Sequence, residues 1–451
     1  MIDPKAILDK HPGSVPRYTS YPTAPHFQPD QGPQMMGALI DGLSSRQPIS
    51  LYAHIPFCDR LCWFCGCHTK HTKQYAPVST YVGFLAREMA LVAERSGKSI
   101  PVSQVHFGGG SPSMLRSQDA IRLGYALRDN FLLTDKTEIS VEIDPSDVSG
   151  DTLAGLNELG ITRASLGVQD FDPKVQKAIN RPQTFEQTET VIRSLRDVGV
   201  GSLNIDVLYG LPYQTIATMS DTINKVIELD PDRIALFGYA HVPWMKKHQQ
   251  MIPTEALPDT QERFRQARHA EELLKEAGYV AIGIDHFAKP NDAMAKAAAS
   301  GRLRRNFQGY TTDECSTLLG LGGSSISRFD GGYIQNVLPT AQYQQAISEG
   351  RLPANKGMAL STDDLIRGFI IERLMCDFEL RFGDLERRFG GLAGPYLAEA
   401  KLLAKSDNDG LCGMVGDTFV IPENARPFAR IVASWFDAYM AETKHRYSVA
   451  V

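Results

Sequence analysis

Apolar, β-branched segments alternate with helical patterns between residues 50 and 277, and this alternation limits the fold more than any other feature of the 451-residue chain. Strands are predicted at residues 50–57, 102–110, 137–145, 162–171, 201–212 and 232–243, and helices at residues 79–95, 117–130, 149–159, 184–198, 215–229 and 259–277. Strands separated by helices of this length imply right-handed crossovers and a parallel sheet. The predicted fold class is α/β, with an open or incomplete parallel (β/α)6-type barrel.

The pattern also predicts how the chain is divided. Residues 279–287 and 316–327 are expected to extend the sheet or line the barrel opening. After about residue 355 the pattern changes, and amphipathic helices are predicted at 361–376, 394–405 and 424–443, with a small hairpin at 411–423. We therefore predict an N-terminal arm (1–48), a barrel domain (49–354) and a mostly helical C-terminal domain that acts as a lid (355–451).

Charge and hydropathy exclude several classes of protein. The chain has 47 basic and 52 acidic residues, a formal net charge of −5, which argues against a general nucleic-acid surface. No apolar run approaches the roughly 20 residues that span a bilayer, and the first 20 residues contain no signal-peptide core. A cytoplasmic protein that binds neither membranes nor nucleic acid is expected.

Four of the seven cysteines lie within ten positions, in the stretch YAHIPFCDRLCWFCGCHTK at residues 52–70. Such a run is compatible with a disulfide staple, a zinc site or an iron–sulfur cluster. A chain of this length needs no staple, and a structural zinc site could use Cys58, Cys62, Cys65 and His68. The spacing Cys-x3-Cys-x2-Cys favours a [4Fe-4S] cluster with three protein ligands, which leaves one iron free to bind a substrate or cofactor.

Polar and glycine residues follow the predicted strands at the ends where α/β folds collect their chemistry. They are Gly108–Pro112, Glu142, Gln169, Asp206 and Tyr239–His241. A single one of these would more often be a turn or a helix cap. Their recurrence in successive units predicts a site at this end of the barrel.

These features resemble a known family. Cys58, Cys62 and Cys65 after a first strand are similar to the signature of radical S-adenosylmethionine (SAM) enzymes. The chain further resembles the oxygen-independent coproporphyrinogen III oxidases of haem biosynthesis, through the motifs PRYTSYPTA, FGGGSP, VEIDP, GVQDF, NIDVLYGLP, DHFAKPNDAMAKA and NFQGYTT. The resemblance runs from about residue 16 to the C-terminus and weakens past residue 355.

The resemblance implies an activity and its partners. A low-potential electron, from a donor such as flavodoxin or ferredoxin, cleaves SAM at the cluster, and the resulting radical abstracts hydrogen from a propionate. Two propionates of coproporphyrinogen III become vinyl groups, which gives protoporphyrinogen IX. A monomer is expected, and the family holds a [4Fe-4S] cluster and two SAM molecules.

The resemblance also implies roles for individual residues. The cluster ligands are Cys58, Cys62 and Cys65, while Cys67 is a supporting neighbour. Tyr52, Gly109 and Glu142 are expected to contact the cluster-bound SAM, and Tyr52, Glu142 and Arg17 are the candidate catalytic residues. The residues expected around a second SAM are Phe64, Gly110, Ser111, Gln169, Arg181, Asp206, Ala240 and Ile326. Gln169, Arg181 and Asp206 could instead be ordinary barrel residues or serve the substrate.

Arginine is the natural partner of the substrate's four carboxylates. Arg17 and Arg181 are the candidates, while the run that contains Arg302, Arg304 and Arg305 favours a solvated helix end. The stiff aromatic segment 16–24 is expected to close over the barrel mouth and sense the substrate, although it could merely pack against the barrel wall.

Other functions stay open at this point. A haem chaperone of the same superfamily would keep the cluster, but it would lack the N-terminal PRYTSYP segment and the cysteine at position 67. A structural iron–sulfur or zinc protein would not need the glycine-rich and acidic strand ends. Another tetrapyrrole-acting radical SAM enzyme, such as a haem-degrading methyltransferase, is the alternative among enzymes.

Overall fold

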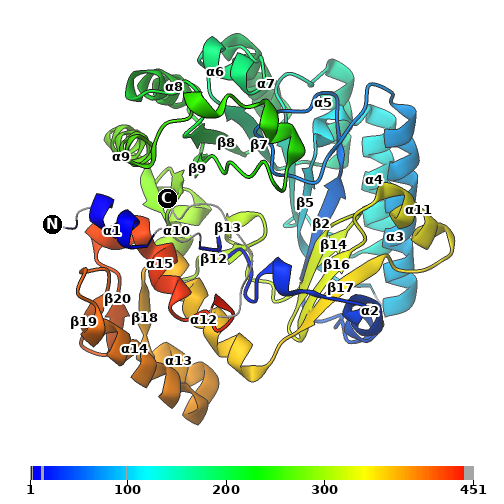
Figure 1. Cartoon of the computed structure of the whole chain (residues 1–451). Helices are drawn as coiled ribbons and strands as arrows, with labels where there is room; N and C mark the ends of the chain where they lie inside the picture. Colours follow the sequence, from blue (N-terminus) through cyan, green and yellow to red (C-terminus); the bar gives the residue numbers. More distant parts are fainter. Residues whose placement is uncertain (1, 3, 12–14, 98, 441–451) are drawn as a thin grey trace.

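A sheet of thirteen strands organises the chain, in the order β1-β17-β16-β15-β14-β2-β5-β6-β7-β8-β9-β11-β10 (Figure 1). The computed structural model describes residues 2, 4–11, 15–97 and 99–440. Six neighbouring strands are parallel: β2 (Ile49–Ile55), β5 (Val102–Gly109), β6 (Glu138–Ile143), β7 (Arg163–Gln169), β8 (Ser202–Tyr209) and β9 (Arg233–Gly238). They are the six strands predicted from the sequence, and the prediction is confirmed.

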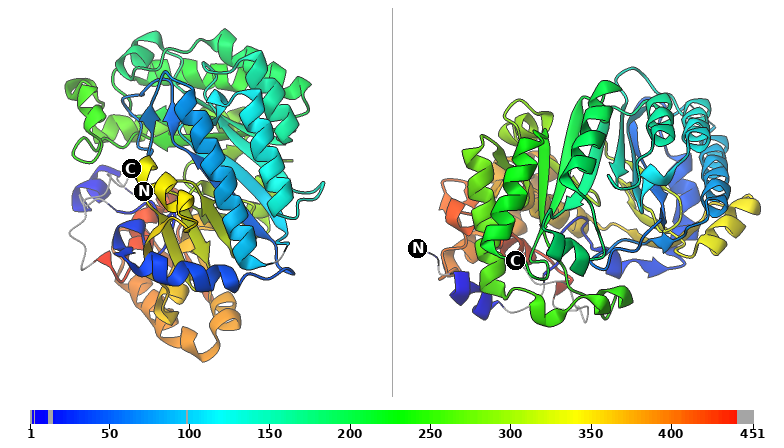
Figure 2. Two further views of the ribbon diagram at one scale, coloured as in Figure 1. Left: turned by 90° about the vertical axis from the view of Figure 1, so that its right-hand side faces the viewer. Right: turned by 90° about the horizontal axis from the view of Figure 1, so that it is seen from above.

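Helices connect these strands and lie on the outer face of the sheet (Figures 1 and 2). They are α3 (Ala76–Ser96), α4 (Ser117–Asn130), α5 (Gly150–Leu159), α6 (Pro173–Ala178), α7 (Phe185–Asp197), α8 (Ile216–Glu228) and α9 (Thr260–Glu276). Capping boxes begin α7 at Thr184 and α8 at Thr215, because each threonine side chain accepts the N–H of the third helical residue. The predicted α/β fold with a parallel sheet is confirmed.

Both additional apolar segments extend the sheet. On one side, β14 (Leu318–Leu321) runs parallel to β2 and is followed by the antiparallel strands β15 (Ile326–Phe329), β16 (Gly332–Asn336), β17 (Ala354–Ala359) and β1 (Gln28–Pro29). On the other side, β11 (His286–Ala288) and β10 (Val280–Ile282) pair antiparallel beyond β9. Helices α10 (Ala293–Ala299) and α11 (Thr340–Ser348) lie in the connections, and β12 (Arg304–Asn306) and β13 (Gly309–Thr311) form a separate two-stranded ladder.

The barrel strands alternate between an apolar outer face and a polar inner face. In β6 every second residue is buried, and these are Ile139, Val141 and Ile143. The residues between them, Ser140 and Glu142, line a cavity of about 220 Å³ inside the barrel. Because side chains alternate along a strand, an apolar contact with the helices places the intervening polar residue in the interior.

A second apolar core is built from the end of the chain and from its beginning. Its elements are α12 (Thr362–Cys376), β18 (Glu379–Arg381), α13 (Phe382–Phe389), α14 (Gly394–Ser406), β19 (Gly413–Val415), β20 (Thr418–Val420) and α15 (Ala429–Ser434). Ile7 of α1 (Pro4–Lys10) belongs to this core, and Figure 1 shows α1 beside the C-terminal elements. Helix α2 (Gln31–Asp41) instead contributes to the barrel core. The predicted arm therefore contacts two cores, and the domain boundaries at 48 and 354 stay a prediction.

The prediction of one long helix over residues 424–443 is wrong. A 3-10 helix covers Glu423–Phe428, α15 ends at Ser434, and residues 441–443 lie outside the described part of the chain. Pro427 lacks an N–H donor and disfavours the α conformation of the residue before it, so a continuous α-helix cannot begin here. Within the described residues, no helix is long and apolar enough to cross a membrane.

Glu88 of α3 ties the sheet extension to the barrel. Its carboxylate accepts hydrogen bonds from Gly322 N (2.7 Å), Asn336 Nδ2 (3.0 Å) and Tyr343 Oη (2.7 Å). Burial raises the pKa of Glu88 from its ordinary value of 4.5 to about 7, although these hydrogen bonds oppose the rise. The folded protein therefore holds this proton more tightly than the unfolded chain does.

Replacing Glu88 by Gln should destabilise the fold by about 1–3 kcal/mol. Both oxygens of the carboxyl group can accept hydrogen bonds from the three surrounding donors, whereas the amide nitrogen of Gln cannot accept any. The stability that the raised pKa contributes is present below about pH 4.5 and is lost as the pH rises through about 7. The deficit of Glu88→Gln should accordingly be largest near pH 5 and smaller at pH 8, measured as urea-unfolding midpoints. Glu94→Gln, on the exposed side of the same helix, should leave the midpoint unchanged at both pH values.

Candidate active site

The cysteine loop lies directly after the first barrel strand. Two short parallel strands, β3 (Phe57–Cys58) and β4 (Lys70–His71), bracket it, and Thr72 N donates to Cys58 O at 2.9 Å. All seven cysteines are free thiols, so the disulfide alternative is excluded. The loop is thus a closed excursion at the end of the barrel where the parallel strands finish.

Residues 246–249, which follow strand β9, hold one side of the loop by its backbone carbonyls. The side chains of this segment donate as follows: Lys246 Nζ to Cys67 O (2.9 Å), His248 Nε2 to Cys65 O (2.7 Å) and Gln249 Nε2 to Phe64 O (2.9 Å). These bonds fix the backbone on both sides of Cys65 without using its sulfur. The thiol therefore stays available as a ligand while its direction is set.

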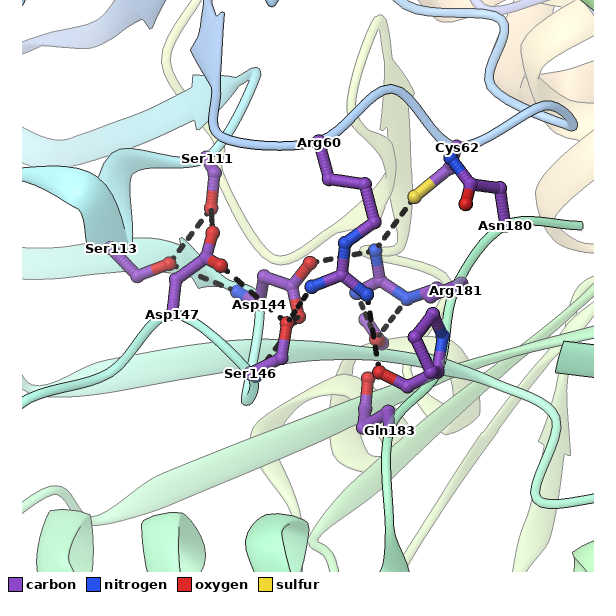
Figure 3. Close-up of polar contacts among 12 residues, drawn as sticks. Arg60, Cys62, Ser111, Ser113, Asp144, Ser146, Asp147, Asn180, Arg181 and Gln183 are labelled. Carbon is purple, nitrogen blue, oxygen red and sulfur yellow. Dashed lines mark hydrogen bonds and ion pairs between the residues drawn. The ribbon is translucent and has the colours of Figure 1, made fainter. Parts of the chain in front are cut away.

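Arg181 holds the opposite side of the loop, as Figure 3 shows. Its Nη1 lies 2.9 Å from Asp144 Oδ2 and 3.3 Å from Cys62 Sγ, and its Nε donates to Gly167 O at 3.1 Å. The Arg181 side chain is buried, at 8% exposure. Arg181 thereby links the ends of β6 and β7 to the cysteine loop, and its predicted contact with a second SAM stays a prediction.

Arg60, on the cysteine loop itself, makes a second link across the same gap. It donates to Pro182 O at 3.1 Å and to Ser146 Oγ at 3.0 Å (Figure 3). Asn180 Nδ2 donates to Leu61 O at 2.9 Å, which secures the turn before Cys62. The loop is therefore anchored to the segments after β6, β7 and β9.

The cysteine loop offers soft thiol donors, which bind iron–sulfur clusters and zinc. Within residues 2–440 where the structure is described, no three Cys, His, Asp or Glu side chains are grouped to hold one ion, whereas zinc needs sulfurs about 2.3 Å from a common centre. A cluster spreads three thiolates over three irons. Cys67 N lies 3.4 Å from Cys65 Sγ, and a hydrogen bond from the Cys67 thiol lowers the pKa of Cys65 to about 7. Cys67 thus stabilises the thiolate of its neighbour.

Tyr52, Gly109 and Glu142, the residues expected around the cluster-bound SAM, lie on the adjacent strands β2, β5 and β6. Gly109 N donates to Glu142 Oε2 at 2.9 Å, and His106 Nε2 lies 3.1 Å from Glu142 Oε1. The Tyr52 ring stacks on His106 with centroids 5.8 Å apart. Burial raises the pKa of Glu142, but the hydrogen bonds from His106 and Gly109 outweigh it and leave the pKa below its ordinary value. An ionised carboxylate is therefore available for a cationic group.

Two glycines allow strand β5 to lie this close to the side chains of the neighbouring strands. A Cβ at Gly108 would lie 2.6 Å from Glu142 Oε1, and a Cβ at Gly109 would lie 2.3 Å from the His54 ring. Gly109 also has a φ of 109°, which side chains rarely allow. Gly108 and Gly109 are therefore required for the close contact between β5 and its neighbours.

Asp206 of β8 lines the same interior cavity as Glu142. It accepts hydrogen bonds from Asn204 Nδ2 at 2.7 Å and Ser165 Oγ at 3.3 Å. Burial and then the charge of Glu142 raise the pKa of Asp206 to about 6. Two neighbouring carboxyl groups with opposite pKa shifts can perform different tasks, one as a permanent anion and one as a group that exchanges a proton.

The remaining residues predicted around a second SAM lie at several strand ends. Gly110 and Ser111 follow β5, Gln169 ends β7 with a positive φ of 72°, Ala240 follows β9, and Ile326 begins β15. Ser111 Oγ is bound to Asp147 at 2.8 Å. Gln169 and Arg181 converge over Gly167, where a Cβ would lie 3.0 Å from a nitrogen of each side chain.

Arg17 and the tyrosines of the N-terminal segment lie in different surroundings. The exposed Arg17 side chain donates to Gly238 O at 3.1 Å, at the end of β9. Tyr18 and Tyr21 belong to the segment that was expected to close over the barrel mouth, and both are buried in the second core, at 4% and 6% exposure. The substrate-sensing role of the segment stays a prediction.

The interpretation of residues 302–305 as a solvated helix end is wrong for two of its arginines. Arg304 and Arg305 begin strand β12, where Arg304 pairs with Glu372 at 2.9 Å. Arg305 is buried, at 8% exposure, and donates to Arg17 O at 3.2 Å. Contacts with α12 and the N-terminal segment, which are distant in sequence, override the local pattern.

The comparisons with known proteins agree with this geometry. The radical SAM superfamily model matches residues 52–226. An oxygen-independent coproporphyrinogen III oxidase of Bradyrhizobium diazoefficiens is 45% identical, over 97% of each chain. An anaerobic coproporphyrinogen III oxidase of Cereibacter sphaeroides is 46% identical, over 97% of this chain and 96% of the relative. The chain belongs to the oxygen-independent coproporphyrinogen III oxidase family.

A solved structure supports the same family. Coproporphyrinogen III oxidase from Escherichia coli, described as a radical SAM enzyme, superimposes with a TM-score of 0.89 and is 38% identical, over 97% of this chain and all of the other. The predicted family is confirmed. Membership in the radical SAM superfamily implies a [4Fe-4S] cluster and SAM as cofactors.

Several site residues of this oxidase family member were not predicted from the sequence. They are His106, Asn204, His248, Gln249 and Arg263. His106 lies two residues before Gly108 on β5, and Asn204 lies two residues before Asp206 on β8. Residues two apart on a strand share a face, so period-two alternation could have indicated both. Residues 248, 249 and 263 follow no local pattern, because they reach the site from a loop and a helix.

Replacing any one of Cys58, Cys62 and Cys65 by Ser should remove nearly all iron and the brown absorbance, because each of these cysteines is expected to bind one iron. Cys67→Ser should retain the iron, since Cys67 acts through its hydrogen bonds to Cys65. Iron content and visible absorbance of anaerobically reconstituted protein measure both. Equal iron loss in all four variants would contradict the three-ligand assignment.

Replacing Glu142 by Gln should weaken SAM binding tenfold or more, because a charge-assisted contact worth about 1.5–3 kcal/mol is lost. Iron content should not change. Anaerobic titration calorimetry with SAM measures the affinity. Glu138→Gln, at the start of the same strand and paired with Arg163, should bind SAM within twofold of the parent; an equal loss in both would show a general effect on β6.

Proposed function

We propose that this chain carries out the reaction of its family, the oxygen-independent conversion of coproporphyrinogen III to protoporphyrinogen IX in haem biosynthesis. Each of two propionates loses carbon dioxide, a hydrogen atom to the SAM-derived radical and one electron to an electron acceptor, and becomes a vinyl group. The observation that carries the proposal is the joint placement of the cysteine loop and the ionised Glu142 at the strand ends of a chain that matches the family over 97% of its length.

When bound, the reduced cluster and SAM supply the one-electron chemistry that removes a hydrogen atom from the substrate. The protein's own task is to bind, orient and exclude water. We infer that Cys58, Cys62 and Cys65 hold the cluster. Glu142 offers its carboxylate to the ammonium group of SAM, and the glycine backbone at 108–110 allows the cofactor's close approach.

We further infer a second SAM beside the first. The convergence of Gln169 and Arg181 over Gly167 supports a polar site between β7 and the cysteine loop. Asp206, with its pKa raised to about 6, lies on the next strand. The remaining proposed contacts are Phe64, Gly110, Ser111, Ala240 and Ile326.

The remaining parts of the proposal concern the whole protein. We infer that residues 355–451 act as a lid domain, since the second core covers the N-terminal segment that contains Arg17. We also propose a monomer, as expected from the sequence. A low-potential donor such as flavodoxin or ferredoxin would reduce the cluster in the cytoplasm.

Product analysis tests this function. Reconstituted protein incubated without oxygen with SAM, dithionite and coproporphyrinogen III should form protoporphyrinogen IX, separated after oxidation to porphyrins by chromatography with fluorescence detection. Methionine should appear together with the vinyl products. Cys62→Ser should form neither. Haem binding without any decarboxylation by the parent would favour the chaperone alternative and overturn the proposal.

A further inference from the structure

A large cavity lies between the barrel and the C-terminal elements, apart from the small interior cavity. Its volume is about 990 Å³, at the upper end of the range for small-molecule sites. The ends of β8 and β9, helix α9 and residues 423–430 line it. Ala240, one of its lining residues, accepts a hydrogen bond from Gln249, which also binds the cysteine loop. The cavity is therefore next to the cluster loop.

Four arginines from different parts of the chain converge on this cavity. They are Arg17 of the N-terminal segment, Arg263 of α9, Arg305 of β12 and Arg430 of α15. Each donates to backbone carbonyls: Arg17 to Gly238 O (3.1 Å), Arg263 to Tyr239 O (2.8 Å), Arg305 to Arg17 O (3.2 Å) and Arg430 to Pro16 O (3.1 Å). Carbonyl oxygens orient a guanidinium but do not neutralise its charge.

The acidic residues of the cavity do not pair with Arg17, Arg263 or Arg305. Over the described ranges, no carboxylate oxygen lies within 4.0 Å of a side-chain nitrogen of Arg17, Arg263 or Arg305. Asp285 is bound to His286 at 2.7 Å, and Glu271 pairs with Arg268 and Lys275 at the rim. Asp285 contributes a negative charge, because its hydrogen bond with His286 and the charges of Arg305 and Arg17 lower its pKa in spite of burial. The four arginines still leave an excess of positive charge around the cavity.

Electrostatics at two of the arginines agree with this picture. Burial, and after it the charge of Arg17, lowers the pKa of Arg430 to about 10, with Arg305 contributing in the same direction. Burial and the charge of Arg17 also lower the pKa of Arg263. Like charges held together in this way repel one another until an anion binds between them.

The backbone leaves room for the Arg263 guanidinium at the cavity floor. A Cβ at Gly210 would lie 2.8 Å from Arg263 Nη1, and a Cβ at Gly238 would lie 3.3 Å from Nη2. Arg263 also lies over the Tyr209 ring, 5.9 Å from its centroid. The guanidinium is thus seated at the ends of β8 and β9, on the side of the barrel where the chemistry is proposed.

We propose that Arg17, Arg263, Arg305 and Arg430 form an anchoring site for the carboxylates that the tetrapyrrole substrate keeps throughout the reaction. This inference rests on the proposed function, in which two of four propionates remain unchanged. Guanidinium groups bind carboxylates through paired hydrogen bonds, and several of them around one cavity match a polycarboxylate rather than a single anion. Anchoring the unreacted acid groups would keep the substrate bound while first one and then the other reactive propionate is used.

Binding of coproporphyrin III, the stable and fluorescent oxidised form of the substrate, tests the anchoring site without SAM or reductant. Arg263→Gln and Arg430→Gln should each weaken binding tenfold or more in a fluorescence titration of the cluster-loaded protein. Arg268→Gln, a rim residue already paired with Glu271, should bind within twofold of the parent. Coproporphyrin III tetramethyl ester, which has no free carboxylates, should bind the parent at least tenfold more weakly than the acid.

Affinity that stays within twofold in Arg263→Gln, or an ester that binds as tightly as the acid, would overturn the anchoring site. The ester comparison uses the parent alone, so it decides the question even if Arg430→Gln, which loses its bonds to the N-terminal segment, does not fold. A parent that binds coproporphyrin through these arginines but forms no vinyl product would refute the proposed function and leave the carboxylate site standing. Vinyl formation with unchanged KM in Arg263→Gln would refute the carboxylate site and leave the proposed function standing.

Discussion

The buried contact of Arg181 with Asp144 and Cys62 is the interaction on which the site depends most. It joins the segments after β6 and β7 to a loop that has almost no regular structure of its own. Taking two charges out of water offsets much of the gain in stability, so such a pair is poor evidence of a stable fold. Its value here is geometric, because the guanidinium has few alternative partners and therefore fixes where Cys62 can lie.

The parallel strands supply the second constraint. Their outer face must be apolar to pack against the helices, and the period-two alternation then leaves the inner face for polar groups. Glu142 and Asp206 stand on this inner face, and their shared cavity moves their pKa values in opposite directions. Burial is common to both carboxyl groups. The hydrogen bonds from His106 and Gly109 distinguish them, because they stabilise only the charged form of Glu142.

The two ends of the chain complete the molecule together. Tyr18 and Tyr21 belong to the core of the C-terminal elements. Arg17 instead donates a hydrogen bond to Gly238 O at the end of β9. Arg430 and Arg305 donate to the backbone of residues 16 and 17, so the N-terminal segment is fixed by the same arginines that surround the large cavity.

The sequence alone determined the six barrel strands, their helices, the group of cysteines after the first strand and the acidic residues at the strand ends, because each of these follows from a short-range spacing along the chain. It did not determine the burial of Arg304 and Arg305, the hydrogen bonds of His248 and Gln249 to the cysteine loop, or the placement of Arg263 and Arg430 around one cavity. These features arise between segments that are far apart in sequence. Tertiary packing brings them together, and no local periodicity records such contacts.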